Sequence, residues 1–268
     1  MKAIILAGGY GTRLQEDIKK LKEIDSKEYE KYKEFLDVPK PLLKIAGEPI
    51  FSRIIKKVEK TTISDVFVRV NNDNINEFRK WKERYGGKLN IKLISDGSPD
   101  NTYGQGVFGG VLYILEKEKV NDDLLILAGD TIFDYDLGSV LESYQKRKKT
   151  TIVVHKERPE FIRLRGVAEF NKEQKILSYE EKPQNPKSIY AATPTFIFDK
   201  ECSELIKQYI KETKNDGNMG NIVPWFLMKG KEAYAYITDR EIFDVVNVES
   251  IKLAQEFLKK KEDRAVHH

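Results

Sequence analysis

The sequence of 268 residues contains one cysteine, three histidines and no long apolar run. A single cysteine, Cys202, excludes an intramolecular disulfide and a cysteine-based zinc site, and it favours a cytoplasmic protein. No stretch approaches the roughly 20 apolar residues that cross a membrane, and the first residues lack the cleavage site of a secretory signal. Only His155 precedes the closing histidine pair, so a histidine-based acyl-transfer triad is disfavoured.

Charged residues are abundant but nearly balanced, with 47 Lys and Arg against 43 Asp and Glu and a net charge of +4. The two signs are interleaved along the chain. This pattern is typical of a solvated surface with many salt bridges, whereas a nucleic-acid-binding face gathers its basic residues together. We therefore expect small-molecule partners, with no nucleic acid and no membrane. Self-association into a homo-oligomer is left open.

The first half of the chain alternates apolar β-branched runs with stretches of helical period. The predicted strands are Lys2–Ala7, Asp65–Val70, Asn90–Ile94 and Leu124–Ala128. The predicted helices are Ile50–Lys60, Asn74–Tyr85 and Gly106–Lys119. Strands that are apolar along their whole length, each followed by a helix, indicate right-handed βαβ units and a parallel sheet covered on both faces.

After Asp130 the pattern changes to short strands with polar connections, which predicts a small antiparallel extension of the sheet. The expected strands are Thr151–His155, Gly166–Phe170, Ile176–Glu181, Thr193–Phe198 and Ala233–Ile237. The expected helices are Leu137–Lys148, Lys200–Glu212, Asn221–Lys229 and Val248–Lys260. No shift in composition marks a linker. We predict one α/β domain over residues 1–262, with a mostly parallel, doubly wound, Rossmann-like sheet.

Two segments stand apart from this domain pattern. Residues 15–37 are dense in Lys and Glu, and we interpret them as a solvated helical insertion with Tyr29, Tyr32 and Leu36 on one side. A lid that orders over bound substrate is the alternative. Residues 263–268 are expected to form a tail, whose final histidine pair resembles the remains of a purification tag.

A glycine-rich loop, LAGGYGTRL, follows the first predicted strand directly. Open α/β sheets bind ligands at the carboxyl ends of their strands, so the loop lies at the binding edge. Gly8, Gly9 and Gly11 let backbone amides approach phosphate oxygens, and Arg13 adds a planar donor. A Walker A loop needs a Lys-Ser/Thr pair, and a dinucleotide fingerprint needs a third glycine where Leu14 stands. Two interpretations of this loop therefore remain: a phosphate-binding loop of another kind, or a tight strand-to-helix turn.

Three further residues carry groups suited to a reaction between two phosphorylated reactants: Lys40, Asp130 and Asp244. Pro39 and Pro41 flank Lys40 and are expected to hold it extended, although a surface lysine in a proline-rich loop fits equally. Asp130, just past a buried strand, suits Mg²⁺, whereas Asp244 alone is more often a turn or capping residue and would be a second ligand only beside Asp130. Mg²⁺ with Lys and Arg would neutralise charge during in-line attack on phosphorus. A phosphate monoester loses its second proton with a pKa of about 6, so no general base is needed.

These motifs in order resemble the sugar-1-phosphate nucleotidylyltransferase family. The resemblance rests on LAGGYGTRL, PKPLLKIAGEPI, LILAGD, YEEKP and FDVVNVESIKLA, which run from Lys2 to about Phe257. No left-handed β-helix of hexapeptide repeats follows, as in the short members of the family. The family's reaction joins a nucleoside triphosphate to a sugar 1-phosphate, gives a nucleotide sugar and pyrophosphate, and uses Mg²⁺.

The resemblance also implies a role for particular residues. Arg13 and Lys40 would be catalytic, and Asp130 and Asp244 would bind Mg²⁺. The implied nucleotide-binding residues are Leu6, Ala7, Gly8, Gly9, Gly11, Thr12, Arg13, Asp100 and Gly104. The implied sugar-phosphate-binding residues are Gly166, Glu181, Lys182 and Thr195.

Two departures from the family pattern leave the substrates undefined. The base-reading region, often Pro-Asp-Gly-Leu-Ala-Gln-Ala, here reads SPDNTYGQGV. The sugar pocket, often Thr-Gly-x-Tyr, here reads TPTF. An acceptor of the inositol, choline or phosphonate type is therefore an alternative. A non-catalytic nucleotide-sugar sensor is a second one, although such proteins commonly lose the lysine or a metal carboxylate.

Overall fold

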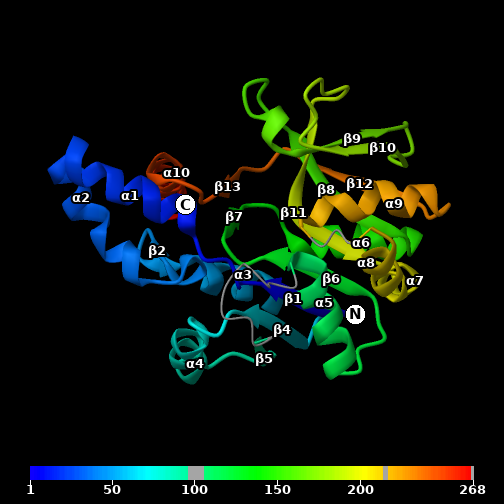
Figure 1. Ribbon diagram of the computed structural model, residues 1–268, viewed down its shortest axis with the longest axis horizontal. Helices are drawn as coiled ribbons and strands as arrows, with labels where there is room; N and C mark the ends of the chain where they lie inside the picture. Colours follow the sequence, from blue (N-terminus) through cyan, green and yellow to red (C-terminus); the bar gives the residue numbers. More distant parts are fainter. Residues whose placement is uncertain (96–105, 214–216, 267–268) are drawn as a thin grey trace.

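The computed structural model describes residues 1–95, 106–213 and 217–266. Within these ranges the chain forms a nine-stranded sheet with helices on both faces, so the predicted single-domain α/β fold is confirmed (Figure 1). Four parallel strands lie in the order β6-β1-β4-β5. Their bounds are Lys2–Leu6 for β1, Asp65–Val70 for β4, Asn90–Ser95 for β5 and Leu124–Ala128 for β6.

A mixed part continues the sheet beyond β6. Strand β11 lies antiparallel to β6 and also pairs with β8 and β9, while β9 and β10 form an antiparallel pair and β12 runs parallel to β8. The bounds are Thr150–Lys156 for β8, Gly166–Phe170 for β9, Ile176–Glu181 for β10, Tyr190–Phe198 for β11 and Ala233–Thr238 for β12. The predicted antiparallel extension is therefore present.

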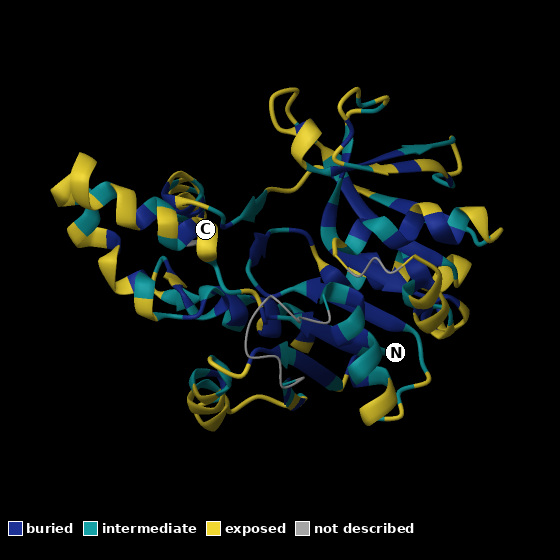
Figure 2. Cartoon of the chain, in the orientation of Figure 1, coloured by how far each residue is buried: buried dark blue, intermediate teal, exposed yellow. Residues whose placement is uncertain are grey.

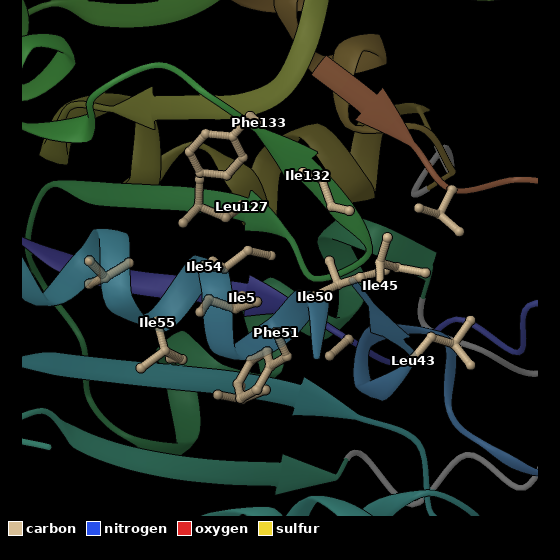
Figure 3. Close-up of a cluster of buried hydrophobic side chains, with 14 of the residues drawn as sticks. Ile5, Leu43, Ile45, Ile50, Phe51, Ile54, Ile55, Leu127, Ile132 and Phe133 are labelled. Atoms are coloured by element: carbon tan, nitrogen blue, oxygen red, sulfur yellow. The ribbon is translucent and has the colours of Figure 1, made fainter. Parts of the chain in front are cut away.

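Two apolar layers cover the sheet because successive side chains of a strand point to opposite faces. Ile5 and Leu127 pack with α3, α4 and α6, and Figure 3 shows them beside the α3 residues Ile50, Phe51 and Ile54. Ile4 and Ile126 pack with α5, α8 and α9. The central strands are accordingly buried along most of their length (Figure 2). The helix bounds are Ile50–Glu59 for α3, Ile75–Glu83 for α4, Gly106–Lys117 for α5, Leu137–Arg147 for α6, Ile206–Thr213 for α8 and Ile222–Met228 for α9. This is the doubly wound arrangement that the sequence predicts.

The charged segment after the glycine loop is helical, as predicted, but one side of it belongs to the core. It comprises α1 (Thr12–Ile24), α2 (Ser26–Tyr32) and the 3-10 helix η1 (Lys33–Asp37). Leu14, Ile18, Tyr32 and Phe35 are buried in the same apolar layer as β1. The segment lies beside α10 (Val248–Val266) at the left of Figure 1, and the Val248 N–H donates to Asp17 Oδ2 at 2.9 Å. It is therefore a packed part of the domain.

Most predicted bounds lie within two residues of those in the structure, and three differ by more. Helix α10 continues to Val266, six residues beyond the predicted Lys260, so it extends into the residues that were expected to form a tail. The predicted helix Lys200–Glu212 is two helices, α7 (Lys200–Glu204) and α8, and Ser203 Oγ bonds back to the Asp199 carbonyl before the break. Strand β11 starts three residues earlier than predicted, at Tyr190, because the residues before Thr193 also pair with β8; the register of this pairing then shifts across Pro194.

Short elements near the loops were not predicted from the sequence. They are the 3-10 helices η2 (Lys40–Leu42), η3 (Ile162–Leu164) and η4 (Met219–Asn221), and the strands β2 (Lys44–Ile45), β3 (Glu48–Pro49), β7 (Thr131–Phe133) and β13 (Ile242–Asp244). Two or three residues are too few to show a period. Among the described residues, none of the helices combines the length and apolarity that crossing a membrane requires.

Candidate active site

The glycine loop is held between the two strands that flank β1. Leu6 C=O accepts the Gly129 N–H at 2.8 Å, and Ala7 N–H donates to the Arg69 carbonyl at 2.8 Å. Gly11 precedes α1 with a φ of 68°, a left-handed conformation that favours glycine. Thr12 and Arg13 follow as the exposed first residues of α1. The loop therefore stands at the carboxyl edge of the parallel strands, as predicted.

Lys40 lies against this loop and forms an ion pair with Asp130. Its Nζ is 2.7 Å from Asp130 Oδ2, and the lysine side chain is only 10% exposed. A Cβ added to Gly11 would lie 3.5 Å from Lys40 Cβ, so the lysine stem runs along the loop. The predicted extended backbone at Lys40 is wrong, because Lys40 starts η2. Pro41 fits in the first turn of a helix, where its missing N–H is not needed.

Asp244 reaches the same region through a strand pair. In the antiparallel pair of β13 and β7, Asp244 is opposite Thr131, the residue after Asp130. Asp244 Oδ2 accepts a hydrogen bond from Arg165 Nη1 at 2.9 Å. Both candidate metal ligands thus come to one edge of the sheet, and each has a cationic partner.

The donor set at this edge suits a hard divalent cation. Carboxylate oxygens are preferred Mg²⁺ ligands, and Mg²⁺ in nucleotide sites typically uses one or two carboxylates with substrate phosphates and water. The described residues contain no cluster of three or more His, Cys, Asp or Glu side chains that would form a complete protein site. Thr131 Oγ1 is buried here without a hydrogen-bond partner among the described residues. Two carboxylates and an unpaired oxygen fit an ion whose other ligands come from the substrates.

Three of the four predicted sugar-phosphate residues lie together at β9 and at the end of β10, namely Gly166, Glu181 and Lys182. Gly166 and Glu181 are partners in the β9–β10 register, and the Tyr179 hydroxyl donates to Glu181 Oε2 at 3.3 Å. A Cβ at Gly166, or at Gly220 in η4, would overlap the Tyr179 hydroxyl. The two glycines therefore make the room in which Tyr179 and Glu181 lie. Lys182 follows as an exposed residue with a φ of 51°.

Burial sets the electrostatics of the Tyr179–Glu181 pair. It raises the pKa of Glu181, while the charge of Lys182 and the hydrogen bond from Tyr179 lower that pKa to a smaller extent. Burial and the neighbouring Glu181 carboxylate also raise the pKa of the Tyr179 hydroxyl. The pair is therefore a poorly hydrated acceptor and donor, which suits hydrogen bonds to neutral hydroxyl groups.

Thr195, the fourth predicted sugar-phosphate residue, lies on β11 and is not part of the group on β9 and β10. It is 1% exposed, and its Oγ1 is 2.6 Å from the Tyr135 hydroxyl, whose pKa is raised to about 12 by burial. A direct contact between Thr195 and a sugar phosphate would require this pair to open.

Two of the predicted nucleotide-binding residues, Asp100 and Gly104, lie outside the described residues.

Several residues of the site were missed in the sequence. Arg165 binds Asp244, and its Nε is 3.5 Å from Glu157 Oε2. The Asn71 side chain is buried and donates to the Gly8 carbonyl at 3.4 Å. Gly220, like Gly166, leaves room for the Tyr179 hydroxyl because it has no side chain. A charge directly before Gly166 was a usable signal for Arg165, whereas the position of Gly220 follows only from tertiary packing.

Replacing Glu181 by glutamine should stabilise the fold in a pH-dependent way. The pKa of Glu181 in the folded state lies above its ordinary value of 4.5. The contribution of this carboxyl group to stability is therefore complete below pH 4.5, and it is lost as the pH rises through the raised pKa. Glutamine does not ionise. The difference in Tm between Glu181→Gln and the wild type should therefore grow in favour of the variant from acid to neutral pH, as measured by thermal unfolding across a buffer series.

The matched control for this experiment is Glu180→Gln, which removes the charge of the exposed neighbour on β10. Its Tm difference should stay small and nearly constant with pH. If the Tm difference of Glu181→Gln varied with pH in the same way as that of Glu180→Gln, burial would not destabilise the ionised carboxylate at position 181.

Fold and site together define an α/β protein with clustered carboxylates and cations at the carboxyl edge of its parallel strands. The chain belongs to the nucleotidyl transferase family, because the model of that family matches residues 36–261. This confirms the family that the motifs predicted. The match begins after most of the charged insertion, so the glycine loop lies before it.

Two proteins illustrate what the sequence is similar to. The Bifunctional protein GlmU of Methanocaldococcus jannaschii is 33% identical over 213 residues, which are 78% of this chain and 42% of that protein. The glucose-1-phosphate adenylyltransferase of Fusobacterium nucleatum is 28% identical over 257 residues, 87% of this chain and 60% of that protein. The chain therefore spans about half the length of these relatives.

A solved structure shares the fold. It is a crystal structure of a Bacillus anthracis protein assigned as a glucose-1-phosphate thymidylyltransferase, in complex with sucrose. The TM-score is 0.73 with 22% sequence identity, and the match covers 96% of this chain and 94% of that chain. At this identity the likeness supports the α/β architecture alone.

Proposed function

We propose that the protein transfers a nucleoside monophosphate from a nucleoside triphosphate to a sugar 1-phosphate, giving a nucleotide sugar and pyrophosphate. The observation that carries this proposal is the Lys40–Asp130 ion pair against the glycine loop. A lysine with a mostly covered side chain, a carboxylate and a glycine-rich turn at one sheet edge are the parts that nucleotidyl transfer needs. The name of the Fusobacterium relative supports a sugar 1-phosphate as the acceptor class.

Each group of residues has a distinct part in this proposal. Gly8, Gly9 and Gly11 bind the triphosphate, and Arg13 neutralises the departing pyrophosphate. Lys40 stabilises charge on the phosphorus under attack. Gly166, Glu181 and Lys182 orient the acceptor. The acceptor phosphate is already ionised at neutral pH, so the chain needs no side chain that removes a proton.

Asp130 and Asp244 would hold Mg²⁺, which when bound neutralises phosphate charge and aligns the two reactants. Lys40 and Arg165 form ion pairs with these two carboxylates, and in this proposal both cations also interact with phosphate oxygens when the substrates are bound. We further propose that residues 1–262, together with the end of helix α10, form the catalytic domain, and that the protein is cytoplasmic.

The direct test is product formation. The wild-type protein with Mg²⁺ should release pyrophosphate from at least one nucleoside triphosphate only when a sugar 1-phosphate is present, with the nucleotide sugar identified by mass spectrometry. Asp130→Asn removes one proposed metal ligand and should raise the Mg²⁺ concentration for half-maximal rate or abolish the rate, without loss of Tm.

A panel of inositol, choline and phosphonate-type acceptors runs in parallel. Pyrophosphate release with one of those and with no sugar 1-phosphate would reject the sugar acceptor while keeping the chemistry. Tight nucleotide binding with no product from any acceptor would reject catalysis and identify a nucleotide sensor.

A further inference from the structure

One buried hydroxyl group beside the candidate metal ligands has no hydrogen-bond partner. Thr131 is 2% exposed, and its Oγ1 is buried without a donor or acceptor among the described residues. The other buried threonines each have a hydrogen-bond partner, and they are Thr150, Thr151, Thr193, Thr195 and Thr238. An unsatisfied buried hydroxyl costs stability, so Thr131 is an exception that needs a physical reason.

The apolar packing of β7 does not require this hydroxyl. The next two residues, Ile132 and Phe133, are buried in the apolar layer that contains residues of α3 and α6. Valine has the β-branched shape of threonine and is equally suited to a strand, yet it carries no polar group that must be paired. The fold by itself would therefore be more stable with valine at position 131, which indicates that the hydroxyl serves the neighbouring site.

The strand pair of β7 and β13 places Thr131 beside the Asp244 carboxylate. Directly opposite residues of an antiparallel pair project on the same face with their Cβ atoms about 4.5–5.5 Å apart, and Asp244 is opposite Thr131. Among the described residues, Arg165 alone donates to the Asp244 carboxylate, and its bond is to Oδ2. An unused donor and a carboxylate with capacity for a second bond are thus neighbours on one face.

We infer that Thr131 is a positioning residue, whose hydroxyl donates to the Asp244 carboxylate when that carboxylate binds the metal ion. This inference rests on the proposed function, in which Asp244 is a metal ligand and Arg165 also interacts with phosphate oxygens. A metal-binding carboxylate is usually oriented by a hydrogen bond from a second residue. The hydroxyl is neutral, so it orients the carboxylate without a positive charge that would repel the ion.

The first measurement is the thermal stability of Thr131→Val with EDTA present. Removal of one unsatisfied buried group should raise Tm by about 2–4 °C in a chain of this size. Thr150→Val is the matched control, because Thr150 is similarly buried and its hydroxyl donates to Asp199 Oδ2 at 3.0 Å. The control should lower Tm, since it leaves the buried Asp199 carboxylate with one bond fewer.

The second measurement is metal affinity without nucleotide, acceptor or turnover. Mn²⁺ replaces Mg²⁺ as a paramagnetic probe, and electron paramagnetic resonance counts the free ion at increasing Mn²⁺ concentration. Thr131→Val should raise the Kd for Mn²⁺ by about 10- to 100-fold, the usual loss when the partner of a metal ligand is removed. Thr131→Ser keeps the hydroxyl and should retain the wild-type Kd, and Asp244→Asn should weaken the same binding and so define the site.

Four results would overturn the inference. One is a Tm that falls in Thr131→Val as in Thr150→Val, which would show that the hydroxyl has a partner such as a buried water. Another is a higher Tm with an unchanged Kd for Mn²⁺. A third is an equal rise of this Kd in Thr131→Ser, which would make the packing of the side chain responsible. The last is Mn²⁺ binding that is absent from the wild type or survives Asp244→Asn. If no product forms in the assay of the proposed function, these Tm and Kd values still test Thr131.

Discussion

Replacing Lys40 by methionine should lower kcat by about 100- to 1000-fold, the usual loss when one donor to transition-state charge is removed. Methionine keeps the length of the side chain along the glycine loop, so the ion pair with Asp130 and the charge at the phosphate are what the variant loses. Steady-state pyrophosphate release at saturating nucleotide and acceptor measures the effect. The KM for nucleotide should change much less than kcat, because the glycine loop is intact.

Lys44→Met is the matched control for this experiment. Lys44 belongs to the same segment, four residues away, but it is exposed on β2. Its kcat should stay within about twofold of the wild type, since an exposed charge contributes little. A Lys40→Met enzyme that loses less than about tenfold would show that charge stabilisation comes from other groups.

Replacing Gly166 by alanine should damage both stability and acceptor binding. The new methyl group would overlap the Tyr179 hydroxyl and approach Glu181 Oε2 to 2.8 Å. Overpacking of this kind costs about 1–3 kcal/mol in the free energy of unfolding. Because Tyr179 and Glu181 must move, the KM for the sugar 1-phosphate should rise while nucleotide affinity is kept. Denaturant unfolding and initial rates at varied acceptor concentration measure the two effects.

A double-variant cycle with Tyr179→Leu identifies the cause. Leucine ends before the ring atoms that the alanine methyl group would meet, so Gly166→Ala should cost less in the Tyr179→Leu background than in the wild type. Gly86→Ala serves as the glycine control, because a Cβ there meets nothing within 4 Å. Equal costs of Gly166→Ala in both backgrounds would show that the overlap with Tyr179 does not determine the loss.

The parallel half of the fold follows from the sequence because fully buried strands are apolar along their length. Asp65–Val70 and Leu124–Ala128 have the predicted bounds for this reason. The same reasoning overlooks the two charged residues of the first of these strands, Asp65 and Arg69, because it interprets the strand as apolar throughout.

The site was only partly predictable. Motif order pointed to Lys40, Asp130 and Asp244, but their proximity depends on η2 and on the β7–β13 pair, which are too short to leave a periodic pattern. The partners that orient them, above all Arg165, depend on a contact between residues 79 positions apart. Such a pairing is defined by the tertiary fold and has no local sequence signature.

The bond between Asp17 and the Val248 N–H also has a kinetic consequence. It joins residues 231 positions apart, and α1, which begins directly after the glycine loop, packs against α10. Contacts of such long sequence separation slow folding, because a large loop of chain must close before they form. During synthesis, which adds about 5–20 residues per second, the first helix must therefore wait many seconds for its last partner to emerge. The apolar side of that helix stays exposed during this interval, when the nascent chain is most open to aggregation and to chaperone binding.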